Sequence, residues 1–113
     1  MGTTTRPELS KKSTYWIEKH RYYELKHFCL QYDIWKEKLK EAEADVEYYK
    51  NRLAMVDNAA YQTDEVLGQY VLKAVTEEIS YDCLNAKYRI PCCKDVYYDL
   101  YRKFFWILDD LRK

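Results

Sequence analysis

The sequence predicts an all-α protein with a single domain. Only two glycines and two prolines interrupt 113 residues, and 34% of the residues are charged, a composition typical of helices. Apolar residues recur at steps of three and four along most of the chain, which is the period of a helix with one buried face. A chain of this length buries a fair core without disulfides or metal.

The N-terminal part is predicted to be an arm followed by a helix. Residues 1–12 are polar and contain Gly2 and Pro7, so we expect a flexible arm. Ser13 or Thr14 is a suitable cap for a helix that runs to about residue 32. The apolar face of this helix consists of Ile17, Leu25, Phe28 and Tyr32.

A second helix is predicted over residues 34–56, with Asp33 as its cap. Its apolar residues form a heptad seam, because they alternate at steps of four and three over about three heptads. The seam consists of Trp35, Leu39, Ala42, Val46, Tyr49, Leu53 and Val56. Such a seam requires a second helix along its length. Either the first helix folds back to complete a helical hairpin over residues 13–57, or a second copy of the chain forms a homodimer.

The C-terminal part, residues 63–113, is predicted to contain three helices. Residues 57–62 are expected to interrupt the helical structure. Thr63 is expected to cap a helix that ends near residue 78. Ser80 caps a short helix over residues 81–88, and Pro91 prevents that helix from continuing. The last helix begins at residue 92 or 93 and runs to about residue 111. A short helix, a tight turn and a longer helix predict a helix-turn-helix-like unit, whose second helix enters a DNA major groove.

A row of basic and aromatic side chains on the last helix is the first candidate site. Three of its residues recur at steps of four, on a face distinct from the apolar stripe predicted to be buried. Such a row can contact phosphates at its ends and a base between them. The alternative interpretation is that these side chains form an ordinary solvated helix face without a partner. The stripe consists of Val96, Tyr97, Leu100, Phe104, Ile107, Leu108 and Leu111. The predicted DNA contacts are the row Lys94, Tyr98 and Arg102, with Lys87, Arg89 and Ser80 beside it.

The charge distribution supports a second candidate site. The formal net charge is zero, but residues 41–65 hold seven acidic and two basic side chains. Residues 66–113 hold eight basic and seven acidic ones, which argues against strong non-specific DNA binding. The acidic segment repels DNA and is instead suited to protein contact. The residues predicted to bind a protein partner are Glu41, Glu43, Asp45, Glu47 and Tyr48.

Catalytic and metal-binding patterns are not found in the sequence. His20 and His27 have no third ligand at suitable spacing, and Cys92 and Cys93 are adjacent, which does not suit tetrahedral zinc. We therefore expect neither enzyme activity, nor a cofactor, nor a metal. No apolar run has the length of a secretory signal or a membrane span, so we expect a cytoplasmic protein with reduced cysteines and no membrane contact.

Two resemblances concern function. Residues 70–105 resemble the C-terminal DNA-reading domain of bacterial sigma factors and the helix-turn-helix of ArpU- and RinA-type phage regulators. Ser80-Tyr81, Leu84, Ile90 and Asp95-Val96 carry this resemblance, and Arg89 stands where those domains usually have glycine. The segments YWIEKHRYYELKHFCLQYDIW, YVLKAVTEEISYDCL and IPCCKDVYYDLYRKFFW look like small phage and prophage proteins of clostridia-like bacteria.

These resemblances imply a phage-encoded DNA-binding transcriptional regulator that acts on double-stranded DNA in the host bacterial cytoplasm. The acidic segment favours a different class of protein, a phage-encoded inhibitor of a host protein or nucleoprotein. Such an inhibitor mimics nucleic acid and targets, for example, a CRISPR nuclease or the transcription apparatus.

Overall fold

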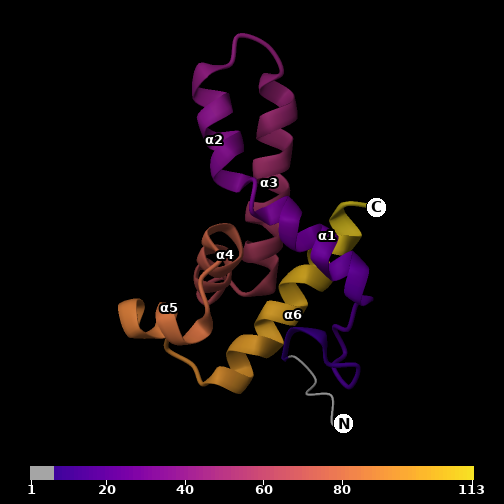
Figure 1. The fold of residues 1–113 in the computed structure, drawn as a ribbon, viewed down its shortest axis with the longest axis vertical. Coiled ribbons are helices and arrows are strands. Elements are labelled where there is room, and N and C mark those ends of the chain that lie inside the picture. Colours follow the sequence, from indigo (N-terminus) through magenta and orange to yellow (C-terminus); the bar gives the residue numbers. More distant parts are fainter. Residues whose placement is uncertain (1–6) are drawn as a thin grey trace.

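Helices make up all the regular structure of the described part of the chain. The computed structural model describes residues 7–113 and contains no strand there, which confirms the all-α prediction. Figure 1 shows a hairpin of two helices that extends from one end of a wider helical body. The elements are η1, a 3-10 helix (Pro7–Leu9), α1 (Lys19–Cys29), α2 (Tyr32–Glu41), α3 (Val46–Thr63), α4 (Gly68–Glu77), α5 (Tyr81–Tyr88) and α6 (Lys94–Leu111).

The core lies where α6 meets α3, α4 and α1. Its centre is formed by large side chains that are almost completely enclosed. These are Tyr22, Leu25, Val56, Val71, Leu84, Phe104, Phe105 and Leu108. Tyr22 of α1 packs edge-on against Phe105, with ring centroids 5.1 Å apart, so aromatic contacts join the two ends of the chain.

The first helix starts later than predicted. Ser13 accepts a hydrogen bond from the backbone N–H of Tyr15 in a turn, and α1 begins only at Lys19. Its cap is Glu18, whose carboxylate accepts hydrogen bonds from the backbone N–H groups of His20 and Arg21 at 2.9 and 3.1 Å. These bonds lower the pKa of the Glu18 carboxyl. Of the predicted arm, residues 1–6 lie outside the described residues, and η1 packs on α6.

The predicted continuous helix over residues 34–56 is wrong. The chain leaves the helix after Glu41 and enters α3 at Val46, and the two halves fold back on each other as an antiparallel hairpin. Asp45 adopts the left-handed conformation at the turn, with φ 62°. An unbroken helix would stack like charges four residues apart, Glu41 on Asp45 and Glu43 on Glu47, which disfavours it. The seam is thus divided between two helices that pack against each other, with Trp35 and Leu39 on α2 and Val46, Tyr49, Leu53 and Val56 on α3.

The α3–α4 corner also differs from the prediction. Residues 57–62 continue α3, and Thr63 is its last residue, with its hydroxyl donating to the carbonyl of Ala59 at 2.7 Å. Asp64 takes the capping role, because its carboxylate accepts from the backbone N–H groups of Val66 and Leu67. At Gly68 the two helices approach so closely that a Cβ atom would collide with the carbonyl oxygen of Ala60.

The last two helices lie where the sequence places them. Ser80 caps α5 by accepting from the backbone N–H of Cys83 at 3.2 Å, and α6 begins after Cys93. The buried face of α6 differs from the predicted stripe, since Val96 and Leu111 are exposed. The face that is buried consists of Tyr97, Tyr101, Phe104, Phe105 and Leu108.

Candidate functional site

Lys94 opens α6 at its corner with α5. Its side chain is exposed, but its ammonium lies 3.6 Å from the carboxylate of Asp82 on α5. The same ammonium is 5.9 Å from the centre of the Tyr81 ring. Lys94 is thus accessible and has an acidic neighbour, which reduces its attraction for a phosphate.

Tyr98 belongs to an aromatic cluster and is half-buried. Its ring centroid lies 5.2 Å from that of Tyr97 and 5.9 Å from that of Tyr101, both on α6. Burial, and then the negative charge of Glu8, raise the pKa of the Tyr98 hydroxyl. The ring is therefore partly occupied by packing within the protein.

Arg102 is the most enclosed member of the predicted row. Only 15% of its side chain is exposed, and its guanidinium lies 3.6 Å from the carboxylate of Asp99 on the same helix. The reason is that the buried face of α6 includes Tyr101 and Phe105, which turns the row toward the body. Of the three residues of the row, only Lys94 is presented openly to solvent.

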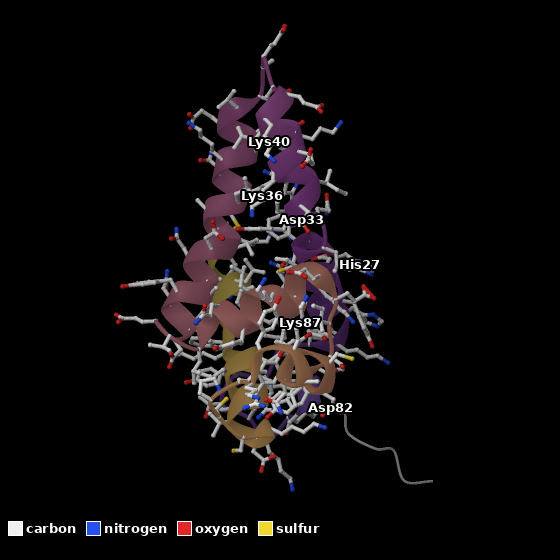
Figure 2. All side chains as sticks on the ribbon, turned by 90° about the vertical axis from the view of Figure 1, so that its left-hand side faces the viewer. His27, Asp33, Lys36, Lys40, Asp82 and Lys87 are labelled. Atoms are coloured by element: carbon white, nitrogen blue, oxygen red, sulfur yellow. The ribbon has the colours of Figure 1, made fainter. Side chains whose placement is uncertain are left out.

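The other predicted DNA contacts lie around α5. Lys87 is exposed near the end of this helix, on the side of the molecule shown in Figure 2, where Asp82 lies near the other end of α5. Arg89 is exposed and follows the helix in the left-handed conformation, with φ 53°. The hydroxyl oxygen of Ser80 already accepts the capping hydrogen bond. Lys87 at the end of α5, Arg89 directly after it and Lys94 at the start of α6 are thus all exposed.

The five residues predicted to bind a protein partner come together at the outer end of the hairpin. We call them the acidic tip: Glu41, Glu43, Asp45, Glu47 and Tyr48, all of them exposed. Figure 1 shows this end of the hairpin as the part of the fold farthest from the body. No basic residue occurs between positions 41 and 49. Lys40, Lys36 and Asp33 follow in that order down α2, away from the tip.

Tyr48 adds an aromatic surface to the acidic tip. Its side chain is 49% exposed, and the guanidinium carbon of Arg52 lies 3.8 Å from the ring centre. The ring of Tyr49 packs edge-on against it at 5.3 Å. These contacts hold an exposed ring in place beside the carboxylates. Because its position is held, less side-chain entropy is lost when a partner covers the ring.

The structure also contains a cluster of polar and aromatic groups that the sequence does not predict. Glu8 of η1, Lys26 of α1 and Glu78 at the end of α4 line one cavity together with tyrosines of α5 and α6. No local pattern signals this cluster, because its members come from five separate elements. The one available hint is the abundance of tyrosine, 13 residues in the whole chain.

Residues 7–113 contain neither a cluster of metal-binding side chains nor a membrane-spanning helix. Nowhere in this range do three or more His, Cys, Asp or Glu side chains gather as a metal site would require. Cys29 is buried, and its burial raises the pKa of the thiol. None of the described helices combines the length and the apolar character needed to cross a bilayer.

No protein-family model, curated protein or solved structure matches this chain. The resemblances to sigma factors and to phage proteins accordingly stay predictions.

Proposed function

We propose that the protein is a protein-binding inhibitor that uses its acidic tip to occupy a basic surface on a host protein or nucleoprotein. The observation that carries the proposal is the placement of four carboxylates at the exposed end of a hairpin, Glu41, Glu43, Asp45 and Glu47. The surfaces with which proteins hold nucleic acid are lined by Lys and Arg. A narrow, negatively charged projection suits entry into such a groove and competition with phosphates.

The composition of the tip supports a protein partner over a purely electrostatic contact. Tyr48 supplies an anchored aromatic ring, and tyrosine is, with tryptophan and arginine, enriched among the residues that contribute most to the energy of an interface. The carboxylates around it favour a cationic partner and speed the encounter. The phage origin implied by the resemblance fits this role, with a CRISPR nuclease or the transcription apparatus as the class of target.

A pull-down with charge-reversed baits tests the proposal. The full-length protein and its Glu41→Lys/Glu47→Lys variant are used to capture proteins from host lysate, with and without nuclease, and mass spectrometry identifies the captured proteins. We expect a nuclease-resistant partner that the variant no longer retains. With the purified partner, the variant should bind at least about tenfold more weakly, and the loss should shrink as salt is added.

A matched control distinguishes the tip from the α5–α6 corner. The Lys87→Glu/Lys94→Glu variant also reverses two exposed charges, but on the body of the protein. It should retain the partner as well as the unaltered protein does. Equal capture by the tip variant would contradict the proposal.

A DNA-binding regulator is the second candidate, and one observation favours it. Arg89 stands where the sigma-like turn usually has glycine, and it adopts the left-handed conformation that glycine favours. Asn85 stabilises the same turn by accepting a hydrogen bond from the backbone N–H of Ile90 at 2.9 Å. The turn between α5 and α6 therefore has a local geometry compatible with a helix-turn-helix.

Binding of the Lys87→Glu/Lys94→Glu variant to a DNA duplex decides between the protein-binding inhibitor and the DNA-binding regulator. If the protein reads DNA, Lys87→Glu/Lys94→Glu should weaken its binding to a duplex and lower the salt dependence of that binding. Arg102→Glu is a poorer test, because it places a carboxylate at a side chain that is only 15% exposed. Unchanged duplex affinity in the Lys87→Glu/Lys94→Glu variant would remove this second candidate.

A further inference from the structure

A cavity of about 240 Å³ opens between η1, α1, α4, α5 and α6. It is smaller than the roughly 300–1,000 Å³ of sites that hold drug-sized ligands, so it suits a small molecule or a single side chain. Four tyrosine rings line the cavity, together with Glu8, Glu78 and Lys26. The tyrosines are Tyr81, Tyr97, Tyr98 and Tyr101.

Glu8 brings a half-buried carboxylate to this cavity. One of its carboxylate oxygens, Oε1, is shielded from solvent and accepts no hydrogen bond from any residue in the range 7–113. A buried carboxylate oxygen without a donor is costly, and such an oxygen commonly has a water or an ion as its partner. Glu8 also lies close enough to the aromatic cluster for its charge to raise the pKa of the Tyr98 hydroxyl, after the larger effect of burial.

The tyrosines form a continuous aromatic wall. The centroid of the Tyr98 ring lies 5.2 Å from that of Tyr97, 5.9 Å from that of Tyr101 and 6.4 Å from that of Tyr81. Tyr97, Tyr101 and Tyr81 are buried, and Tyr98 is the ring with the greatest remaining exposure. Clustered aromatic rings beside a carboxylate attract organic cations, because the ring faces carry partial negative charge.

We propose that this cavity binds an alkylammonium group, of the kind found in a free amine or at the end of a lysine side chain. The alkyl part lies against the tyrosine rings, and the ammonium pairs with the negative charge of the Glu8 carboxylate. The charge balance of the lining supports a cation over an anion, since Glu8 and Glu78 outnumber Lys26. This site is separate from the acidic tip, so either proposal can fail without the other.

The inference is tested by titrating the full-length protein, labelled in its tyrosine rings, with n-butylammonium and following the ring resonances by NMR. We expect saturable shifts at Tyr98 and its cluster, with an affinity in the millimolar range that is typical of a small cation. An acetylated, amidated lysine is titrated in parallel. Comparable binding identifies a lysine side chain as a ligand, and binding of butylammonium alone identifies a free amine.

Two variants change the affinity in opposite directions. Glu8→Gln keeps the shape of the side chain and removes its charge, and it should weaken butylammonium binding about tenfold. Lys26→Gln removes the repelling cation from the lining and should tighten binding severalfold. Glu37→Gln, at an exposed position of α2 outside both sites, is the matched control and should leave the affinity unchanged.

Three results would overturn the inference. The first is the absence of any saturable shift with butylammonium or with the lysine derivative. The second is equal binding of the neutral isostere 1-butanol, which would show an apolar pocket without selectivity for charge. The third is unchanged affinity in both Glu8→Gln and Lys26→Gln, with the tyrosine spectrum showing that both variants are folded.

Discussion

The helical body and the outer part of the hairpin differ in how completely they cover their apolar side chains. In the body, Leu25, Leu84 and Phe104 have no exposed surface. In the outer hairpin, the seam residues Leu39 and Leu53 are only partly buried, because α2 and α3 have just each other to pack against. The most completely buried side chains thus lie in the body, and the outer hairpin holds a charged surface away from it.

The largest expected effect is in the centre of the body. Phe104→Ala should lower the free energy of unfolding by about 3–5 kcal/mol, because it leaves a cavity where the structure cannot collapse. Leu53→Ala in the hairpin should cost only about 1–2 kcal/mol, since the side chain already contacts solvent. Chemical denaturation measures both values. An equal cost at the two positions would mean that a second copy of the chain covers the hairpin in solution.

A smaller effect is expected at the corner that joins the two regions. Gly68→Ala should lower the free energy of unfolding by about 1–3 kcal/mol, because the added Cβ collides with the carbonyl oxygen of Ala60. Helix propensity alone favours the opposite sign, since alanine is better than glycine inside a helix by about 1 kcal/mol. The sign of the measured change therefore decides whether α3 and α4 touch as described. A gain in stability would contradict this close contact.

The smallest effect concerns Asp64, which caps the same corner. Its hydrogen bonds from the backbone N–H groups of Leu67 and Val66 lower the pKa of its carboxyl. The stabilisation is therefore complete above the ordinary pKa of an aspartate, about 4, and is lost as the pH falls through the lowered value. Asp64→Asn keeps a capping oxygen but does not titrate. The variant should show a flatter dependence of melting temperature on acid pH, and an unchanged dependence would argue against the cap.

The part of the fold that sequence predicts well is the part with local signals. Ser80 and Pro91 mark the ends of a short helix by chemistry that acts within a few residues, and α5 and α6 begin where these signals indicate. The break at residues 42–45 contains neither glycine nor proline, and its one local signal is the weak repulsion between like charges four residues apart. The left-handed positions Asp45, Glu78 and Arg89 likewise have no glycine that would mark them in the sequence.

The candidate sites show the same limit. The residues of the acidic tip are predicted from charge alone, whereas the sequence places them along one continuous helix and not at the end of a hairpin. The row on α6 was placed on a free face because Tyr101 and Phe105 were left out of the apolar stripe, and including them turns Arg102 toward the body. Glu8 lies in a segment predicted to be an arm, so its position beside the tyrosines follows from packing and from no motif.

The pair of tyrosines inside the core has a consequence at high pH. The hydroxyl groups of Tyr22 and Tyr101 share a hydrogen bond of 2.9 Å, and burial, followed by this neighbour, raises the pKa of Tyr101 well above its ordinary value. An unfolded chain loses phenolic protons near pH 10, whereas the folded chain retains those of its core. The stabilisation from this difference is complete below that pH and is lost as alkali is added. The tyrosine-rich interior thus limits how basic a solution the folded protein can withstand.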